Sequence, residues 1–307
     1  MKSAIVSGAN GFIGSKLVKE LSEGSYKVWA IVKDENENIE DIVNLDGVNI
    51  VYCDMSEYET LKSKIPEKDI DIFYHLAWMG VSGEVRSDHQ LQLDNAAYTC
   101  RAYLSAVDMG ISKFIYAASL MEYDVMKQFQ VDSTKLKRNQ HYGIGKLSAH
   151  LMLISLANNS PTALCAALIS NVYGPGENTP RLVNSTIRML LKEKSTPFTH
   201  GRQLCDFIYI DDVCRGLKLI GEKGSRDYYY LGSCRIMPLR RYIKLFKYID
   251  PNVELRLGEI PFDGESLTYS EFDINRLYFD TGFETEVSFE EGIQRTAEWI
   301  RETEMSG

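Results

Sequence analysis

The sequence has few features of an extracellular, membrane or metal-binding protein. Its six cysteines are scattered over 307 residues, with no C-x-x-C pair and no metal-ligand spacing. Such cysteines in a chain of this size are typical of a reducing compartment. No apolar run reaches the roughly 18 residues that a membrane span needs. We therefore expect a cytoplasmic protein without a metal site or membrane span, and the strand-like N-terminus does not resemble a signal peptide.

Positive charge is also scarce. The 34 Lys and Arg residues are outnumbered by 43 Asp and Glu residues, which gives a formal net charge of −9. No basic block stands out, so nucleic acid is not expected to be the main partner. Apolar residues make up 44% of the sequence, as in ordinary globular proteins, and the length suits one large domain or two smaller ones.

The most informative stretch lies at the beginning of the chain. An apolar run of strand length over 3–6 precedes three glycines with G-x-x-G-x-x-G spacing, and an apolar helical pattern follows. This order is typical of a dinucleotide-binding loop, in which glycines permit a tight turn and close approach to the pyrophosphate. A tight turn that binds nothing is the alternative. The residues predicted to contact the cofactor here are Gly8, Asn10, Gly11, Phe12, Ile13 and Gly14.

The end of the second predicted strand, 26–32, bears on the choice between NAD and NADP. An acidic side chain there would bind the ribose 2′-hydroxyl of NAD, whereas a basic one would pair with the 2′-phosphate of NADP. Lys33 occupies this position, about 20 residues after the glycine loop, and favours NADP. If Asp34 or Glu35 reaches the ribose instead, the cofactor is NAD.

Two further strand ends are expected to complete the cofactor site, because ligands of an open parallel sheet lie at the carboxyl ends of its strands. These strands are predicted over 48–53 and 70–76. The residue after the first is suited to the adenine amino group, and the end of the second to packing beside the cofactor. The residues predicted at these two ends are Asp54, Met55, Leu76 and Ala77.

Two polar residues in this region are given structural roles. His75 lies at the end of an apolar strand, where we expect it to fill space rather than to act as a catalyst. Asn95 lies within a helix predicted over 89–109, and we expect it to bond to the backbone of a neighbouring strand and support the site.

A second group of polar residues indicates proton chemistry. Ser119 ends a fifth predicted strand, and a helix over 140–157 contains Tyr142 and Lys146. Residues four apart share one helix face, so the Lys146 ammonium is expected to lower the pKa of the Tyr142 phenol. Such a phenol can exchange a proton with a carbinol or carbonyl oxygen, which Ser119 would hold. The same spacing also occurs in ordinary surface pairs, so its weight depends on its place downstream of the glycine loop.

Taken together, the motifs resemble the extended short-chain dehydrogenase/reductases, the family of NAD(P)-dependent nucleotide-sugar epimerases, dehydratases and reductases. The similar stretches include GANGFIG at 8–14, HLA at 75–77, YGIGK at 142–146, SNVYGPG at 170–176, DFIYIDDV at 206–213 and TGFETEVSFEEGI at 281–293. The resemblance implies an α/β fold with a Rossmann-type doubly wound parallel sheet in residues 1–170 and a return segment near 205–235. It also implies a smaller α/β substrate domain in residues 171–307, and a homodimer.

The resemblance also implies roles for single residues. Tyr142 would be the acid/base, Lys146 would modulate it and bind the nicotinamide ribose, and Ser119 would bind the reacting oxygen. Asn171 would lie near the sugar or its phosphate, and Arg181 is a substrate-binding candidate.

This sequence departs from the family pattern in ways that limit the function. Dehydratases of the family carry an Asp-Glu pair after the serine, but Leu120 and Met121 stand here and cannot move a proton. Glu122, one residue further on, is not counted. An arginine for the diphosphate is usual where this chain has Cys205, and another is usual near residues 260–264, where none occurs. The candidates to replace these arginines are Arg181, Arg188 and Arg202.

These observations predict a reductase that uses NADPH to reduce a keto group of a nucleotide-linked deoxysugar, with Tyr142 supplying the proton. The alternative is an NAD-dependent nucleotide-sugar epimerase of the C4 type, because the same three residues serve both reactions. A further alternative is a non-catalytic sensor that binds NADP.

Overall fold

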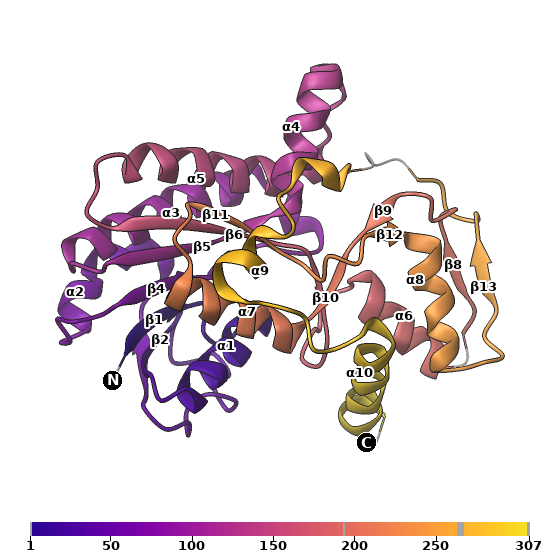
Figure 1. The fold of residues 1–307 in the computed structure, drawn as a ribbon, viewed down its shortest axis with the longest axis horizontal. Coiled ribbons are helices and arrows are strands. Elements are labelled where there is room, and N and C mark those ends of the chain that lie inside the picture. Colours follow the sequence, from indigo (N-terminus) through magenta and orange to yellow (C-terminus); the bar gives the residue numbers. More distant parts are fainter. Residues whose placement is uncertain (1, 193, 263–266, 306–307) are drawn as a thin grey trace.

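The computed structural model describes residues 2–192, 194–262 and 267–305. Its centre is a seven-stranded parallel sheet with the order β11-β6-β5-β4-β1-β2-β3 (Figure 1). The strands are β1 (Ser3–Ser7), β2 (Lys27–Val32), β3 (Val48–Tyr52), β4 (Ile72–His75), β5 (Lys113–Ser119), β6 (Ala163–Ile169) and β11 (Tyr228–Leu231). The strand order reverses between β1 and β4, and ligands of doubly wound sheets bind at such a switch point.

Helices cover both faces of this sheet. Helices α1 (Phe12–Glu23) and α7 (Ile210–Lys223) pack together on one face, and α3 (His89–Asp108) and α5 (His141–Ala157) pack together on the other. Side chains alternate between the two faces of a strand, so Val6 faces the first pair of helices and Ile5 the second. The short helix α2 (Leu61–Lys64) follows β3.

The C-terminal part of the chain forms a smaller mixed region beside the sheet (Figure 1). Its helices are α6 (Leu182–Leu191), α8 (Leu239–Leu245) and α10 (Phe289–Glu304), and α9 (Arg276–Thr281) packs back on α7. Its strand pairs are β7 (Asn171–Tyr173) with β10 (Phe207–Tyr209), β8 (Thr196–Phe198) with β13 (Leu255–Leu257), and β9 (Leu204–Cys205) with β12 (Met237–Pro238). Aromatic rings of Tyr173, Phe207, Tyr242 and Phe289 pack on one another in its core.

The predicted α/β class is confirmed, with differences in single elements. Strand β7, which is not among the predicted elements, forms beside glycine and proline because Val172 and Tyr173 are buried against β10. Asp212 lies in the first turn of α7, and its carboxylate accepts hydrogen bonds from the backbone N–H groups of Glu286 and Val287, at 2.9 and 3.1 Å. Helix α4 (Leu120–Asp132), which projects from the body in Figure 1, is not among the predicted elements.

None of the helices in the described part of the chain combines the length and the hydropathy that a membrane crossing requires.

Candidate active site

The glycine loop between β1 and α1 is a cradle that only small residues can form. Gly8 has a φ of +66°, and a Cβ on it would lie 2.9 Å from the backbone nitrogen of Ala77. A Cβ on Gly14 would lie 1.9 Å from the carbonyl oxygen of Gly8. Side chains at these positions would therefore push the loop away from both α1 and the end of β4. The free N–H groups at the start of α1 suit a phosphate, so the loop fits a dinucleotide.

A cavity of about 520 Å³ lies over this loop and is called the cofactor cavity below. Its lining includes every residue predicted for the cofactor at the glycine loop and the strand ends. These are Gly8, Asn10, Gly11, Phe12, Ile13, Gly14, Lys33, Asp54, Met55, Leu76 and Ala77. The structure thus brings together residues from four segments of the chain, while their individual roles in binding remain predictions.

Charged side chains of both signs line the cofactor cavity together with Lys33, the residue that favours NADP. Burial raises the pKa of the Asp54 carboxyl, but two hydrogen bonds from Ser56 and the charge of Lys33 outweigh burial, so the pKa is lowered. Glu37 also lines the cavity and accepts a hydrogen bond of 3.0 Å from Asn10 Nδ2. The lining thus carries the ammonium of Lys33 and the carboxylates of Asp54 and Glu37.

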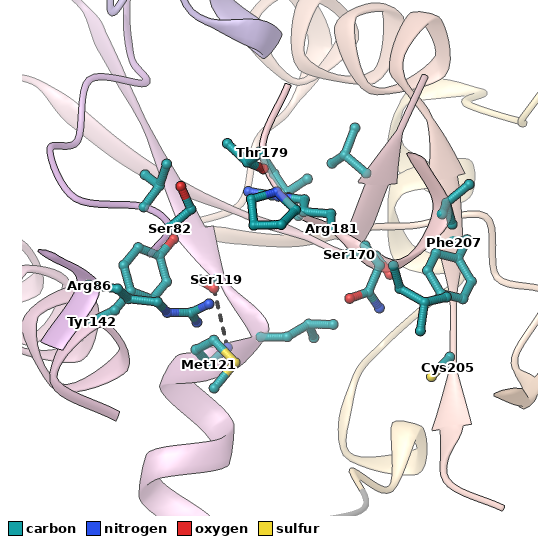
Figure 2. A pocket seen from close by; sticks show the side chains of 18 of the residues that line it. Ser82, Arg86, Ser119, Met121, Tyr142, Ser170, Thr179, Arg181, Cys205 and Phe207 are labelled. Atoms are coloured by element: carbon teal, nitrogen blue, oxygen red, sulfur yellow. Dashed lines mark hydrogen bonds between the residues drawn. The ribbon is translucent and has the colours of Figure 1, made fainter. Parts of the chain in front are cut away.

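A second cavity, of about 440 Å³, adjoins the first and is called the sugar cavity below. The two cavities share Val81, Thr179 and Arg181 in their linings. The sugar cavity lies between the end of β5, the start of α5 and the C-terminal region, as Figure 2 shows. Its lining includes the predicted residues Ser119, Tyr142, Asn171 and Arg181.

Tyr142 lies near the N-terminus of α5, where aromatic and cationic groups surround its ring. The Trp78 ring meets it edge-on at 6.1 Å between centroids, and the Arg86 guanidinium carbon lies 4.5 Å from its centroid. Burial raises the pKa of the Tyr142 phenol, while a hydrogen bond with Ser119 and the charges of Arg181 and Arg86 lower it. In contrast to the prediction from spacing, the net direction is upward.

Lys146 is buried behind Tyr142 and lines neither cavity. Its Nζ donates to the carbonyl oxygen of Ala117 at 2.9 Å and lies 3.9 Å from the centroid of the Trp78 ring. Trp78 lines the cofactor cavity and therefore covers the ammonium on that side. Burial lowers the pKa of Lys146 to about 7, against the opposing charge of Glu122. The positive charges that lower the pKa of Tyr142 are those of Arg181 and Arg86.

Ser119 ends β5 and is held by the residues that follow it. Its backbone N–H donates to Glu122 Oε1 at 2.9 Å, and its Oγ accepts a hydrogen bond from the backbone N–H of Met121 at 3.2 Å (Figure 2). Glu122 is fully buried, and its other oxygen lies 2.7 Å from His150 Nδ1. Glu122 is therefore a fixed support of the strand end and does not line the sugar cavity, whereas Leu120 and Met121 do.

The polar residues of the opposite wall are also held by neighbouring groups. Asn171 donates from Nδ2 to the carbonyl oxygen of Asp206 at 2.9 Å, and Arg181 Nε lies 3.1 Å from Glu177 Oε2. Cys205 lines the sugar cavity where an arginine is usual in the family that the sequence resembles. Of the other two arginines considered for the diphosphate, Arg188 forms hydrogen bonds of 2.8 to 3.0 Å with Glu304.

Arg202 is absent from the lining of both cavities. The stretch 260–264, which lacks the second family arginine, lies partly outside the described residues, because 263 and 264 are not described.

The structural role predicted for His75 is confirmed, whereas Asn95 bonds to backbone in the connection after β4 and not in a strand. The buried His75 ring lies between Ser7 Oγ at 2.9 Å and Thr99 Oγ1 at 3.0 Å, so it joins β1, β4 and α3. Asn95 exchanges two hydrogen bonds with the backbone of Met79, at 3.0 and 2.8 Å. These bonds fix the chain directly after Ala77.

The lining residues that are missing from the sequence prediction include Trp78, Glu37 and Arg86. Trp78 directly follows the HLA stretch, and that position could have drawn attention to it. Glu37 and Arg86 lie in polar connections, where no period or motif marks them. Only the folded structure brings them to the cavities.

Comparison with known proteins identifies the family. The model of the NAD dependent epimerase/dehydratase family matches residues 4–232. Human dTDP-D-glucose 4,6-dehydratase is 24% identical over 98% of this chain and 90% of its own length.

Two solved structures share the fold. One is UDP-N-acetylglucosamine 4-epimerase from Methanobrevibacter ruminantium in complex with UDP-N-acetylmuramic acid, with a TM-score of 0.79, 24% identity and 98% of each chain covered. The other is UDP-glucuronic acid 4-epimerase from Bacillus cereus in complex with NAD, with a TM-score of 0.78, 21% identity and 98% and 99% covered.

The chain therefore belongs to the NAD dependent epimerase/dehydratase family, as the sequence motifs indicated. A nicotinamide dinucleotide is the cofactor typical of this family, and the glycine cradle under the cofactor cavity fits it.

Proposed function

We propose that the protein is an NAD-dependent epimerase that acts at C4 of a nucleotide-linked sugar. One observation carries this proposal: Ser119 and Tyr142 line a cavity that adjoins the glycine-loop cavity, and Leu120 and Met121 provide no acid for dehydration. The similarity to epimerase structures supports it. The epimerase, which the sequence favours less than the NADPH-dependent reductase, is thus the preferred function here.

The reaction needs a proton acceptor that later returns the proton, and Tyr142 suits both steps. When bound, the nicotinamide would supply a site for reversible hydride transfer. Ser119 would hold the sugar oxygen by a hydrogen bond while the Tyr142 phenol exchanges a proton with it. The charges of Arg86 and Arg181 lower the pKa of this phenol against the effect of burial and thus favour proton transfer.

A second candidate is the NADPH-dependent ketoreductase, and Lys33 in the lining of the cofactor cavity favours it. The neighbouring Glu37 opposes a 2′-phosphate, since like charges repel. A reductase and an epimerase would share Ser119, Tyr142 and Lys146, so the site alone does not separate them.

We also propose that the protein is a homodimer. Large apolar side chains are more than half exposed on α3 and α5, where they form a surface that a second copy would cover. These residues are Leu93, Leu104, Leu151, Met152 and Ile154.

The two candidate reactions differ in their net redox balance, which provides the test. The purified protein is analysed for bound NAD or NADP and then incubated with UDP- and dTDP-linked sugars, without added cofactor. An epimerase converts the sugar to its C4 epimer with no net change in absorbance at about 340 nm. A reductase acts only on keto-sugars and consumes one NADPH per product, a result that would overturn the epimerase.

Replacement of the acid/base residue gives a sharper prediction. Tyr142→Phe removes only the hydroxyl, so we expect turnover to fall by about 10²–10⁴-fold. Cofactor affinity should change less than about twofold, because Tyr142 lines the sugar cavity. Turnover is followed by chromatography of the nucleotide sugars and affinity by titration with NADH. Unchanged turnover would refute the role of Tyr142.

A further inference from the structure

One cation of the sugar cavity, Arg86, is placed to do more than lower the pKa of Tyr142. Arg86 lies in the 3₁₀ turn η2 (Glu84–Ser87), between β4 and α3, and its guanidinium stacks beside the Tyr142 ring. Figure 2 shows the guanidinium extending into the cavity, between that ring and Met121. It therefore lies beside the side chain that would exchange a proton with the sugar oxygen.

Arg86 is partly buried, and no salt bridge holds its guanidinium in the described ranges. Its Nε is buried without a hydrogen-bond partner. Burial lowers the pKa of Arg86, and the charges of Tyr142 and Asp124 oppose this effect. No Asp or Glu lines the sugar cavity. Partial burial of a cation with an unsatisfied donor is unfavourable, so an anion in this cavity would gain both a charge interaction and a hydrogen bond.

Arg181, the other arginine of the lining, differs in this respect. It is already paired with Glu177 Oε2 at 3.1 Å, and it borders the cofactor cavity as well. Arg181 therefore lies at the boundary of the two cavities. Arg86 lines the sugar cavity and does not line the cofactor cavity. An anion bound by Arg86 would accordingly lie near Tyr142 and away from that boundary.

A carboxylate matches these features best. The planar guanidinium fork binds a carboxylate through two parallel hydrogen bonds. A neutral hydroxymethyl group at the same position would form no ion pair with the Arg86 guanidinium. Leu120 and Met121 form an apolar wall beside it, which strengthens a charge interaction by excluding water.

We infer that Arg86 selects nucleotide sugars that carry a carboxylate on the sugar ring, next to the carbon on which Tyr142 acts. This inference rests on the proposed function and names the substrate class of the same site. Arg86 is a specificity-determining residue in this view, because it distinguishes acidic sugars from neutral ones.

The test uses a matched pair of ligands, UDP-glucuronate and UDP-glucose, which differ only in the group at C6. Their dissociation constants are measured by calorimetry with the NAD-loaded protein, and a dTDP-linked pair is measured in the same way. We expect the acidic sugar to bind at least about tenfold more tightly than the neutral one. Arg86→Gln should abolish this preference by weakening the acidic sugar alone, and Arg86→Lys should restore part of it.

Arg181→Gln is the matched control from the same cavity, and we expect it to weaken both members of the pair by the same factor. Thermal unfolding and NAD affinity show whether each variant is folded. An equal loss of both sugars in Arg86→Gln would assign Arg86 to the shared diphosphate or to the fold and would overturn the inference. The absence of any preference in the unchanged protein would overturn it as well.

The result also distinguishes this inference from the proposed function. If the neutral sugar is bound and epimerised but the acidic one is not preferred, the inference alone fails. If the protein binds NAD but neither binds nor converts any of the four nucleotide sugars, both the proposed function and the inference fail.

Discussion

At the scale of single residues, the lining of the cofactor cavity carries charges of both signs. Lys33 is exposed at the end of β2, and Glu37 lies in the same lining. A 2′-phosphate carries more negative charge than a hydroxyl, so it gains from the ammonium and loses from the carboxylate. The effect of each charge on the relative affinity for NADPH and NADH can be measured, because a substitution at Lys33 or Glu37 changes only one of the two charges.

Lys33→Ala should weaken the binding of NADPH by about three- to tenfold and that of NADH by less than twofold, as expected for one exposed charge pair. Affinities are measured by fluorescence titration at low ionic strength, where screening is weakest. Lys19→Ala is the control, because Lys19 is an exposed α1 lysine outside the cavity lining. Equal losses for NADPH and NADH would leave NAD as the preferred cofactor.

The residues of the site differ in how far the sequence reveals them. The glycine loop, Ser119 and Tyr142 follow from short motifs at the ends of predicted elements. Arg86 and Glu122 do not, because their contacts arise only when distant segments fold together. The pKa of Tyr142 was predicted in the wrong direction, since spacing along a helix says nothing about burial.

At the scale of elements, His75 connects three of them through its two ring nitrogens. Burial, followed by the charge of Lys146, lowers its pKa from 6.5 to about 3. Between these two values the unfolded chain binds a proton that the native protein does not bind. The free energy of unfolding therefore falls as the pH falls through this window, and His75 has no such effect above it.

Comparison of the unchanged protein with His75→Gln tests this dependence. Between pH 7.5 and pH 5.5, the free energy of unfolding of the unchanged protein should decrease by about 1.4 kcal/mol more than that of the variant. Urea denaturation at the two pH values gives the four free energies, and the difference cancels other titrating groups. Equal decreases would mean that His75 becomes protonated in the native protein.

Elements with a strong apolar pattern could be predicted from the sequence, and their bounds differ by one or two residues. Helix α5 begins at His141, one residue after the predicted start. Strand β7 was missed because the stretch Asn171–Tyr173 is short and is followed directly by glycine and proline. Its formation depends on β10, which lies more than 30 residues further along the chain.

At the scale of the whole molecule, the exposed apolar surface of α3 and α5 indicates self-association. An aspartate in such a surface would have to be buried on pairing, at a cost of several kcal/mol. Ile154→Asp should therefore convert a dimer to a monomer of 34.9 kDa, as measured by light scattering after size exclusion. Val43→Asp is the control, because Val43 is exposed outside these helices. A monomeric unchanged protein would refute the dimer.

The division of the chain into a dinucleotide-binding domain, residues 1–170, and a mainly substrate-binding domain, residues 171–307, remains a proposal. The chain crosses back to the main sheet at β11, and α9 packs on α7, so the two parts are interleaved. Composition alone does not reveal such interleaving, because both parts have ordinary apolar cores.

Because the two cavities share a wall, binding and release of the ligand in one cavity would affect the ligand in the other. Val81, Thr179 and Arg181 border both, so a sugar nucleotide and a dinucleotide would be neighbours at the same three side chains. An enzyme that keeps one dinucleotide through many cycles exchanges only the sugar past this wall, and its rate is independent of added NAD. A reductase must exchange both in every cycle, so departure of the spent dinucleotide would limit its rate.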